Sequence, residues 1–496
     1  MKDWAIYGIP SQPAQYEKNM KKREYKENIM KTTIFREYDI RGIVGDELVI
    51  EQVYDLARAI VTFFKKKYPN ATTIIVGRDG RTHSPVIFSH ITNAITDMGL
   101  HVIDIGICPT PATYFAACFL NIPIALAITA SHNPKQYNGI KMVGVWGAQI
   151  QEIKNIFQQK AFDSNISGIS GTIRTHDIIS DYIEYLANHF SHLKKYPIKA
   201  VIDCGNGAAG SVIPELIKKM EWPNIKLLCE TVDGTFPNHE ADPTVRKNML
   251  DVIEALEQNQ ELEVALGFDG DADRMNPMTK SGHLVPGDQM LGIYAQYMLK
   301  DFPGATVVFD IKSSGGLIDF LTKHNGVPYM SPSGHSIIKE RMAATKALLG
   351  GELSCHFFFH DRYFGYDDGI YAALRLFEIL HATQKTLDQL LQDFPKKVSS
   401  PEFRIMCLSD SQKTVIVEHV KTIFAARKDL ELITIDGVRA HMNYGWGLAR
   451  ASNTQPAISL RFESDTQEGL HHVKTDFFNA LQPYFEEQRL RKDLEL

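Results

Sequence analysis

The sequence lacks most of the features that mark a specialised class of protein. Its six cysteines are widely spaced and form no C-x-x-C pair, which argues against a disulfide scaffold and against the usual zinc motifs. No apolar run approaches the roughly 20 residues that a membrane helix needs. The net charge of −6 provides no basic surface for nucleic acid. We therefore expect a cytoplasmic protein with no membrane and no nucleic-acid partner.

The composition is typical of a folded chain of several domains. The 496 residues are 44% hydrophobic and 23% charged, which excludes a mainly disordered chain and suggests three or four domains. Residues 1–32 differ from the rest, because they are rich in Lys, Glu, Tyr and Gln and show little apolar periodicity. We expect a flexible N-terminal extension there, and Met30 is an alternative start.

Three similar segments recur along the chain. Each is a short apolar run that ends in small or polar residues and precedes a helical pattern, and they begin at Thr73, Ala200 and Val307. Strands that alternate with helices predict βαβ units and mostly parallel sheets. The domain-like spacing indicates three related α/β domains. Ligands bind at the carboxyl ends of the strands in such domains, so the loops that follow are the places to search.

The last hundred residues have a different pattern. Residues 403–408, 432–436 and 457–462 are predicted strands, and residues 412–426 and 466–481 are predicted helices. This order predicts a small α+β domain.

Residues 205–210, Gly-Asn-Gly-Ala-Ala-Gly, match a dinucleotide-binding motif. They follow an apolar strand and open a helical pattern, and Glu230 lies where a ribose-binding acid would be. The motif is short, and a tight turn requires glycine for its own geometry. Asp203 and Asn206 do not suit a pyrophosphate. An NAD-binding oxidoreductase is therefore an alternative that stronger signals elsewhere disfavour.

The first of four chemical loops carries Ser131. The segment Thr129-Ala-Ser-His-Asn-Pro134 follows the apolar run that begins at Ile122, so its serine is placed to act as a nucleophile or phosphoryl acceptor. A neutral serine is a weak nucleophile and needs a base or a strong electrophile nearby. His132 and Lys141 are candidates. A helix N-cap is the structural alternative.

The second loop, Gly267-Phe-Asp-Gly-Asp-Ala-Asp-Arg274, carries three carboxylates. Asp269, Asp271 and Asp273 follow an apolar strand at residues 264–268. Oxygen ligands of this kind favour Mg²⁺ or Ca²⁺ over Zn²⁺, but Arg274 stands where an EF-hand needs glycine. An acidic turn would leave three carboxylates repelling one another, so we favour a metal site. A phosphatase with an aspartyl nucleophile is the rival for this loop.

The third and fourth loops offer polar groups for a sugar and a phosphate. Residues Glu352, Ser354 and His356 alternate, so an extended segment would place them on one side, although a polar edge strand has the same pattern. Residues 445–456 form a predicted loop with an arginine, two hydroxyls and an amide close together. That composition suits a phosphate, which arginine binds through paired charge-assisted hydrogen bonds. Together the four loops indicate phosphoryl transfer on a phosphosugar.

From Ile34 to its end, the chain resembles the α-D-phosphohexomutase family, most closely its bacterial phosphomannomutase/phosphoglucomutase branch. The matching segments begin with 35–42, 129–134 and 137–141. They continue through 203–207, 236–239, 267–274, 334–339, 351–356 and 450–454. The resemblance implies four domains around a central cleft: three related α/β domains with mixed, mostly parallel sheets, and a C-terminal α+β domain. The implied ranges are 1–32 for the extension, then 33–177, 178–282, 283–396 and 397–496.

The resemblance also assigns roles to the residues of the four loops. It implies Ser131 as the phosphoserine, with Asp269, Asp271, Asp273 and Ser131 holding one Mg²⁺. The remaining implied residues surround the substrate: a sugar loop of Glu352, Ser354 and His356, a distal phosphate loop of Arg450, Ser452, Asn453 and Thr454, and further cleft positions at Tyr38, Arg41, Lys141, Arg274, Lys312 and His335. In this family the glycines at 205–210 form a structural turn.

We therefore expect an intramolecular phosphotransferase that interconverts hexose 1-phosphates and hexose 6-phosphates of mannose, glucose or both. Phosphorylated Ser131 would donate to the substrate, and the hexose 1,6-bisphosphate would reorient without leaving. Lys141, His335 and Arg41 are candidates to move the hydroxyl proton. A monomer or weak dimer is expected, and an oxidoreductase or a metal-dependent sugar phosphatase is the alternative.

Two further expectations follow from the same residues. The sugar loop has Cys355 where the family usually has glycine, and its small side chain is expected to be tolerated. Because the whole chain is acidic, its positive charge is expected to gather in the cleft, at Arg41, Lys141, Arg274, Lys312 and Arg450.

Overall fold

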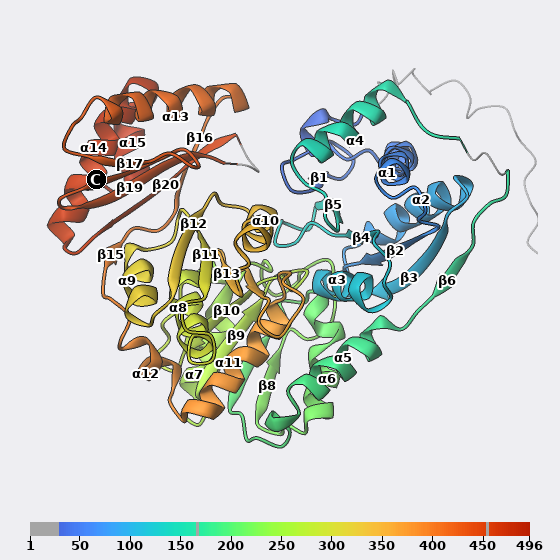
Figure 1. Ribbon diagram of the computed structural model, residues 1–496, viewed down its shortest axis with the longest axis horizontal. Coiled ribbons are helices and arrows are strands. Elements are labelled where there is room, and N and C mark those ends of the chain that lie inside the picture. Colours follow the sequence, from blue (N-terminus) through green and yellow to red (C-terminus); the bar gives the residue numbers. More distant parts are fainter. Residues whose placement is uncertain (1–28, 165–167, 453–455) are drawn as a thin grey trace, which may run out of the picture.

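The computed structural model describes residues 29–164, 168–452 and 456–496. The predicted extension at 1–32 therefore lies almost entirely outside the described residues. Four sheets follow one another along the chain, and we number the domains I to IV in that order. Figure 1 shows domain I and domain IV on opposite sides of domains II and III.

Domain I contains a mixed six-stranded sheet. Its strand order is β1-β5-β4-β2-β3-β6, and the four strands β4, β2, β3 and β6 run parallel. The strands are β1 Ile40–Ile43, β2 Thr73–Arg78, β3 His101–Ile107, β4 Ala125–Ile128, β5 Tyr137–Met142 and β6 Ile173–Thr175. The helices are α1 Val53–Lys67, α2 Ser84–Asp97, α3 Thr110–Phe119 and α4 Ala148–Gln159. Helix α1 buries one apolar face, as its spacing of three and four residues requires.

Domains II and III have four-stranded sheets of one pattern: three parallel strands and one antiparallel edge strand. The orders are β10-β9-β7-β8 and β12-β11-β13-β14. Domain II contains β7 Ala200–Asp203, β8 Ile225–Leu228, β9 Val264–Phe268, β10 Met275–Thr279, α5 Ile178–His189, α6 Ile213–Met220 and α7 Leu250–Gln258. Domain III contains β11 Thr306–Asp310, β12 Val327–Ser331, β13 Leu349–Gly351, β14 Phe357–Phe359, α8 Gly287–Met298, α9 Gly315–Lys323, α10 His335–Thr345, α11 Gly369–Thr383 and α12 Leu387–Leu391.

The three recurring segments of the sequence occupy equivalent places. They form β2, β7 and β11, and each of these strands has a parallel neighbour on both sides. A strand in that position is buried on both faces, which explains its nearly continuous apolar run. The predicted fold class is confirmed: three α/β domains with mixed, mostly parallel sheets precede a different C-terminal domain.

Domain IV is an antiparallel sheet covered by helices. It contains β15 Val398–Ser399, β16 Phe403–Met406, β17 Glu431–Ile433, β18 Val438–Met442, β19 Gly445–Ala451, β20 Ala457–Ser464, α13 Asp410–Ala425, α14 Gln467–Leu481 and α15 Glu487–Leu494. The prediction that residues 445–456 form a loop was wrong for its first half, because β19 pairs with β18 and β20 there. Two glycines and small residues hid that strand.

Short 3-10 helices connect some of these elements. They are η1 Thr32–Ile34, η2 Ile50–Gln52, η3 Ser191–Leu193, η4 Ala208–Ser211, η5 Arg246–Met249 and η6 Gln482–Tyr484. Within the described ranges, no helix combines the length and apolar character needed to cross a membrane.

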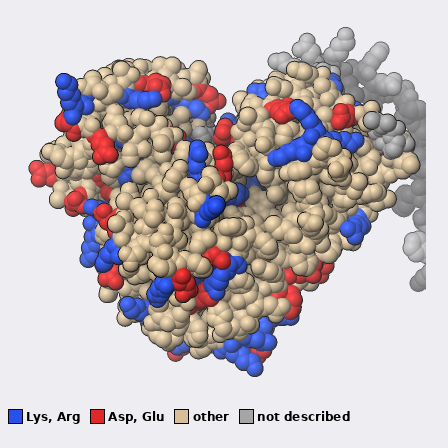
Figure 2. Space-filling view, in the orientation of Figure 1, with Lys and Arg blue, Asp and Glu red and all other residues tan. Residues whose placement is uncertain are grey.

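The hydrophobic cores show how the domains are joined. One core runs through domains II and III and into the α3 side of domain I, whereas domain IV has a core of its own. A small cluster of Ile311, Trp446 and Leu448 connects domain IV to domain III. Figure 2 shows the surface hollowed between domain IV and domain I. The candidate site lies where this cleft meets the strand ends.

Candidate active site

Ser131 lies in a strained loop directly after β4. Its side chain is buried, and its φ of 49° is in the left-handed region that non-glycine residues seldom adopt. The backbone is fixed on both sides: the Ser131 N–H donates to Thr129 Oγ1 at 2.9 Å, and the Arg81 guanidinium donates to the Ser131 carbonyl at 2.7 Å. Strain of this kind persists only where the surroundings hold it, and it is common at functional sites.

The acidic loop after β9 meets Ser131 directly. Ser131 Oγ donates to Asp269 Oδ2 at 2.7 Å across 138 residues of sequence. Gly270 lies against the serine loop so closely that a Cβ there would be 2.5 Å from the Ser131 carbonyl oxygen. Asp269, Asp271 and Asp273 are fully buried. The first two predicted loops therefore form one centre.

The donor set of this centre fits a hard divalent cation. The three carboxylates place oxygens within 4.8 Å of one another, and Asp271 Oδ1 and Asp273 Oδ1 are buried without a hydrogen-bond partner among the described residues. Burial and the neighbouring carboxylates raise the pKa of Asp269 to about 7. An oxygen-only set of this charge is typical of a Mg²⁺ site.

Lys141 supplies the nearest positive charge. It reaches from β5 and donates to Asp271 Oδ2 at 2.7 Å and to Asp273 Oδ2. Burial alone would lower the pKa of Lys141, but the two carboxylates raise it well above its ordinary value. The lysine is therefore held as a cation and is poorly suited to accept a proton.

Arg274 connects the acidic loop to the sugar loop. Its Nε donates to Asp269 Oδ2 at 2.9 Å, and its backbone pairs with that of His356. Its terminal NH2 is buried without a hydrogen-bond partner in the described structure, while NH1 lies 3.7 Å from Asp242 Oδ1. One donor thus remains for an anion beside the carboxylate cluster.

The sugar loop brings its side chains together by a turn. The prediction of an extended segment was therefore wrong. The Glu352 N–H donates to the His356 carbonyl at 3.0 Å, and the Cys355 N–H donates back to the Glu352 carbonyl at 3.0 Å. Ser354 Oγ lies 3.1 Å from His356 Nδ1. Cys355 is buried with a φ of 67°, the conformation that glycine adopts without cost. The turn accommodates the cysteine but strains its backbone.

Two histidines face the centre from domain III. The rings of His335 and His356 stack with centroids 5.7 Å apart. His356 Nε2 lies 3.5 Å from Asp273 Oδ1, whereas His335 Nδ1 faces Asp367 Oδ2 at 3.2 Å. Burial disfavours the charged form of both rings and lowers the pKa of His335, but Asp273 outweighs burial and raises the pKa of His356.

The distal end of the cleft is formed by β19 and the loops opposite it. Arg450 lies on β19 and donates from Nε to Asp436 Oδ2 at 2.8 Å. Ser452 follows the strand; the predicted phosphate ligands Asn453 and Thr454 lie outside the described residues. Tyr38 reaches across from domain I and donates to the Ser333 carbonyl at 2.6 Å.

Lys312 sits at the joint between domains III and IV. Its ammonium lies 3.5 Å from Asp310 Oδ2 and 3.5 Å from Glu402 Oε2. The same loop is held from domain IV, because Arg439 donates to the Ile311 and Ser313 carbonyls at 2.8 Å each. The position of Lys312 therefore depends on both domains.

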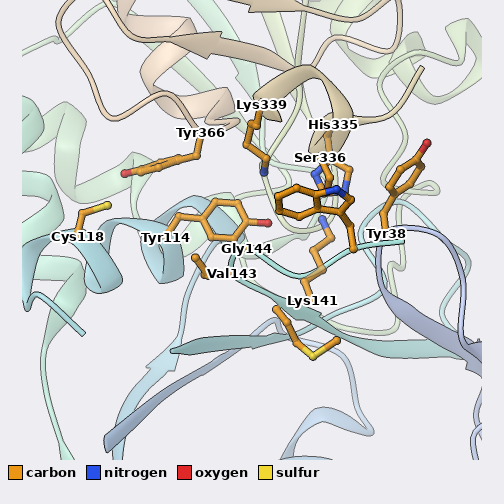
Figure 3. Close-up of a pocket in the computed structure, with 12 residues that line it drawn as sticks. Tyr38, Tyr114, Cys118, Lys141, Val143, Gly144, His335, Ser336, Lys339 and Tyr366 are labelled. Carbon is orange, nitrogen blue, oxygen red and sulfur yellow. The ribbon is translucent and has the colours of Figure 1, made fainter. Parts of the chain in front are cut away.

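A cavity of about 210 Å³ adjoins the site between domains I and III. Figure 3 shows Tyr114 and Lys141 from domain I opposite His335 and Lys339 from domain III. The Lys339 ammonium lies 4.8 Å from the centroid of Tyr114. The rest of the wall is mainly aromatic and aliphatic, so the cavity offers apolar surface beside the charged groups.

The five cations that the sequence predicts in the cleft are accompanied by carboxylates, which the sequence did not show. Each of the five has a carboxylate partner: Arg41 with Asp39, Lys141 with Asp271 and Asp273, Arg274 with Asp269, Lys312 with Asp310 and Glu402, and Arg450 with Asp436. Sequence reasoning missed most of these partners. It also missed Arg81, although Arg81 follows β2 as Ser131 follows β4 and Asp269 follows β9.

The Gly205–Gly210 turn packs tightly against the acidic loop. A Cβ at Gly207 would lie 2.8 Å from the Gly270 carbonyl oxygen. The Ala208 N–H, which would face a phosphate in a dinucleotide site, donates to that carbonyl at 2.9 Å. The turn therefore supports the acidic loop and leaves no room for a pyrophosphate.

Comparison with known proteins agrees with this architecture. Family models for the phosphoglucomutase/phosphomannomutase domains match the chain in order: α/β/α domain I at residues 32–163, domain II at 180–282, domain III at 286–398 and the C-terminal domain at 407–480.

Whole-chain relatives agree as well. A phosphomannomutase/phosphoglucomutase of Pseudomonas syringae pv. tomato is 40% identical over 453 residues, 91% of this chain and 96% of its own. A phosphoglucomutase of Neisseria meningitidis serogroup A is 40% identical, covering 90% and 95%. A crystal structure of a phosphoglucomutase/phosphomannomutase family protein from Burkholderia thailandensis is 33% identical and has a TM-score of 0.83, covering 92% of this chain and 98% of its own.

Fold and site together define a phosphohexomutase, an enzyme of the phosphotransferring isomerases. The chain belongs to the phosphoglucomutase/phosphomannomutase family. The predicted family and class of enzyme are confirmed, and these matches support neither the oxidoreductase nor the phosphatase.

Proposed function

We propose that this enzyme interconverts hexose 1-phosphates and hexose 6-phosphates of mannose, glucose or both through a phosphorylated Ser131. The observation that carries the proposal is the hydrogen bond of 2.7 Å from Ser131 Oγ to Asp269. It joins a strained serine to a buried carboxylate cluster beside a sugar-type polar loop. A phosphoryl acceptor, a cation site and a hydroxyl-binding loop thus share one centre.

Asp269, Asp271, Asp273 and the Ser131 oxygen would hold one Mg²⁺. The ion, when bound, would neutralise charge that develops on the transferred phosphoryl group. Arg274 supports the same group through its unpaired NH2. Arg41 donates to Asn133 Oδ1 at 2.6 Å in the serine loop, so it steadies that loop and adds positive charge. Preorganised charges of this kind account for most of the catalysis expected in phosphoryl transfer.

The reaction begins with a phosphate on Ser131 and a hexose monophosphate in the cleft. The P–O bond to Ser131 Oγ breaks as a bond to the free sugar hydroxyl forms; that hydroxyl loses its proton to a base, and the released Ser131 oxygen takes up a proton. The resulting hexose 1,6-bisphosphate reorients, and its other phosphate returns to Ser131, whose hydroxyl gives up its proton while the released sugar oxygen is protonated. Glu352, Ser354 and His356 would hold the ring hydroxyls.

The geometry narrows the candidates for the proton transfer. Lys141 is held as a cation by two carboxylates, and an arginine stays charged, so Lys141 and Arg41 act by charge. Of the predicted candidates His335 remains. Burial lowers the pKa of His335 and leaves the ring able to accept a proton, whereas Asp273 raises the pKa of His356 and favours its charged form.

The phosphate that is not reacting would be held at the distal end. Arg450 and Ser452, together with Asn453 and Thr454, would bind it, and Tyr38 and Lys312 would close the cleft around it. The terminal NH2 of Arg450 is buried without a hydrogen-bond partner among the described residues. The same groups must accept either end of the bisphosphate in turn.

The proposal includes the organisation of the whole chain. The four domains would span 33–177, 178–282, 283–396 and 397–496, after an extension at 1–32. The enzyme would be a cytoplasmic monomer or weak dimer. A small-molecule phosphosugar would be its substrate, without nucleic acid or membrane.

Intact-mass analysis with peptide mapping tests the proposal. One phosphate is expected on the purified protein, at Ser131. Ser131→Ala should abolish mutase activity, whereas Ser89→Ala, an exposed serine of α2, should retain it. Full activity of Ser131→Ala would refute the mechanism. A coupled assay with mannose 1-phosphate and glucose 1-phosphate determines the preferred sugar, and release of inorganic phosphate without isomerised sugar would indicate a phosphatase.

Asp271→Asn tests the cation site separately. Removing one carboxylate should reduce kcat at least about a hundredfold, whereas the variant should still fold, because Lys141 keeps its ion pair with Asp273. Unchanged activity would exclude Asp271 as a ligand. Asp251→Asn, on the exposed face of α7, is the matched control.

A further inference from the structure

A second cluster of metal-type ligands lies at the same edge of the domain II sheet. Asp203 ends β7, Cys229 directly follows β8, and His239 comes from the loop that leads toward α7. The catalytic carboxylates follow β9, which borders β7 on its other side. The two clusters share no residue, but they are neighbours, because Asp203 pairs with Gly267 of β9, two residues before Asp269.

The three side chains converge on one point. One oxygen of Asp203, the sulfur of Cys229 and a ring nitrogen of His239 lie within 4.8 Å of one another. His239 Nε2 is 2.9 Å from Asp203 Oδ2 and 3.9 Å from Cys229 Sγ. Asp203 is buried, whereas the other two are partly exposed. An ion from solvent can therefore reach them.

The histidine is oriented as metal-binding histidines are. Its Nδ1 donates to the Glu240 carbonyl at 3.0 Å, so the other nitrogen, Nε2, faces the carboxylate and the sulfur. A ligating histidine commonly gives its second N–H to a backbone carbonyl in this way. Cys229 has a φ of 48°, and the backbone holds this strained conformation because Cys229 accepts from the Asn206 N–H at 2.9 Å.

The separations match a tetrahedral Zn²⁺ site. Bond lengths of about 2.3 Å to sulfur and about 2.0–2.1 Å to nitrogen and oxygen give tetrahedral edges of about 3.6 Å for N···S and about 3.3 Å for N···O. The observed separations of 3.9 Å and 2.9 Å differ from these by a few tenths of an ångström. A small movement of His239 Nε2 away from Asp203 Oδ2 and toward Cys229 Sγ would bring both separations to the tetrahedral values.

We propose that Asp203, Cys229 and His239 bind a Zn²⁺-type cation, separate from the catalytic ion. Binding would displace the proton of the Cys229 thiol and any proton on His239 Nε2, and solvent would supply the fourth ligand. The ion would join the end of β8 to the loop that carries His239. That loop continues to Asp242, which lies 3.7 Å from Arg274, so the site would stiffen a segment that borders the catalytic centre.

Cobalt titration of the full chain in saturating Mg²⁺ tests the site. Mg²⁺ occupies the oxygen-only centre, and Co²⁺ reports a thiolate ligand by a sulfur-to-metal charge-transfer absorption in the near ultraviolet. We expect one equivalent of Co²⁺ to produce this band and one equivalent of Zn²⁺ to remove it. Cys229→Ser should eliminate the band, and His239→Gln should weaken Co²⁺ binding at least tenfold.

Two controls separate this site from other sources of the signal. Cys407→Ser, a partly exposed cysteine of domain IV, should leave the band unchanged, and so should Asp271→Asn. Zn²⁺ should raise the melting temperature of the unsubstituted chain but not that of His239→Gln. Absence of the band from the unsubstituted chain, or its persistence in Cys229→Ser, would overturn the proposal.

Discussion

Replacing Lys141 by methionine should destabilise the enzyme strongly, and only when no divalent cation is present. Lys141 is buried between Asp271 and Asp273, which are themselves fully buried. Methionine has a similar length but no charge, so three carboxylates would then face only Arg274 and His356. Breaking a buried ion pair by removing one partner costs about 3–5 kcal/mol, which corresponds to a fall in melting temperature of about 6–20 °C for a domain of 150–250 residues.

The assay is thermal unfolding in excess EDTA and in excess Mg²⁺. Mg²⁺ should stabilise the Lys141→Met variant more than the unsubstituted enzyme, because the ion replaces the missing positive charge and binds only the folded state. The matched control is Lys199→Met, whose side chain is 36% exposed and lies 3.5 Å from Glu261; such surface changes stay within about 0.5 kcal/mol. A Lys141→Met variant that melts within about 2 °C of the parent in EDTA would refute the electrostatic argument.

Three further predictions follow from the same structure. Gly270→Ala places a Cβ 2.5 Å from the Ser131 carbonyl oxygen and should displace the serine. In a steady-state assay kcat should therefore fall at least about tenfold. A normal kcat would contradict the close packing of these two loops. Cys355→Gly should be as stable as the parent or up to about 1 kcal/mol more stable, because it relieves a left-handed backbone, whereas Cys355→Val should be destabilised in urea unfolding; the reverse order would count against strain at this turn. Burial raises the pKa of Asp368 from 3.8 to about 6, so the contribution of this side chain to the stability of the parent falls as the pH rises through that interval. Between pH 4 and pH 7 the unfolding free energy of Asp368→Asn should rise by up to about 3 kcal/mol relative to that of the parent. A difference in unfolding free energy that does not change with pH would disprove the shift.

Sequence predicted the features that depend on local pattern. The runs at β2, β7 and β11 are continuous in apolar residues, and strand ends in parallel sheets share an edge. Ser131 and Asp269 follow strands of different sheets and are 138 residues apart, so their assignment to one centre came from the combination of the four loops and from the resemblance to the family. Strand β9 has the predicted bounds, Val264–Phe268.

The features that sequence could not show depend on contacts between distant segments. Asp436 lies in no motif, and Asp39 lies in the matching segment 35–42 without a role assigned to it. Both matter because tertiary packing places them on cleft arginines. Strand β19 contains glycines at 445 and 447 that local patterns assign to a turn, yet pairing on both sides makes it a strand. The sugar loop converges through the turn at Cys355, which alternation along an extended segment could not predict.

The carboxylates that accompany every cleft cation have a consequence for turnover. A bare cluster of five cations would hold a bisphosphate so tightly that its release would limit the rate. Here each cation already has an anionic partner, which would neutralise part of the positive charge that a phosphate meets at either end of the cleft. In the proposed mechanism the two ends of the bisphosphate would then change places without either end being held too tightly to leave. The acidic partners would act as internal competitors for the cations.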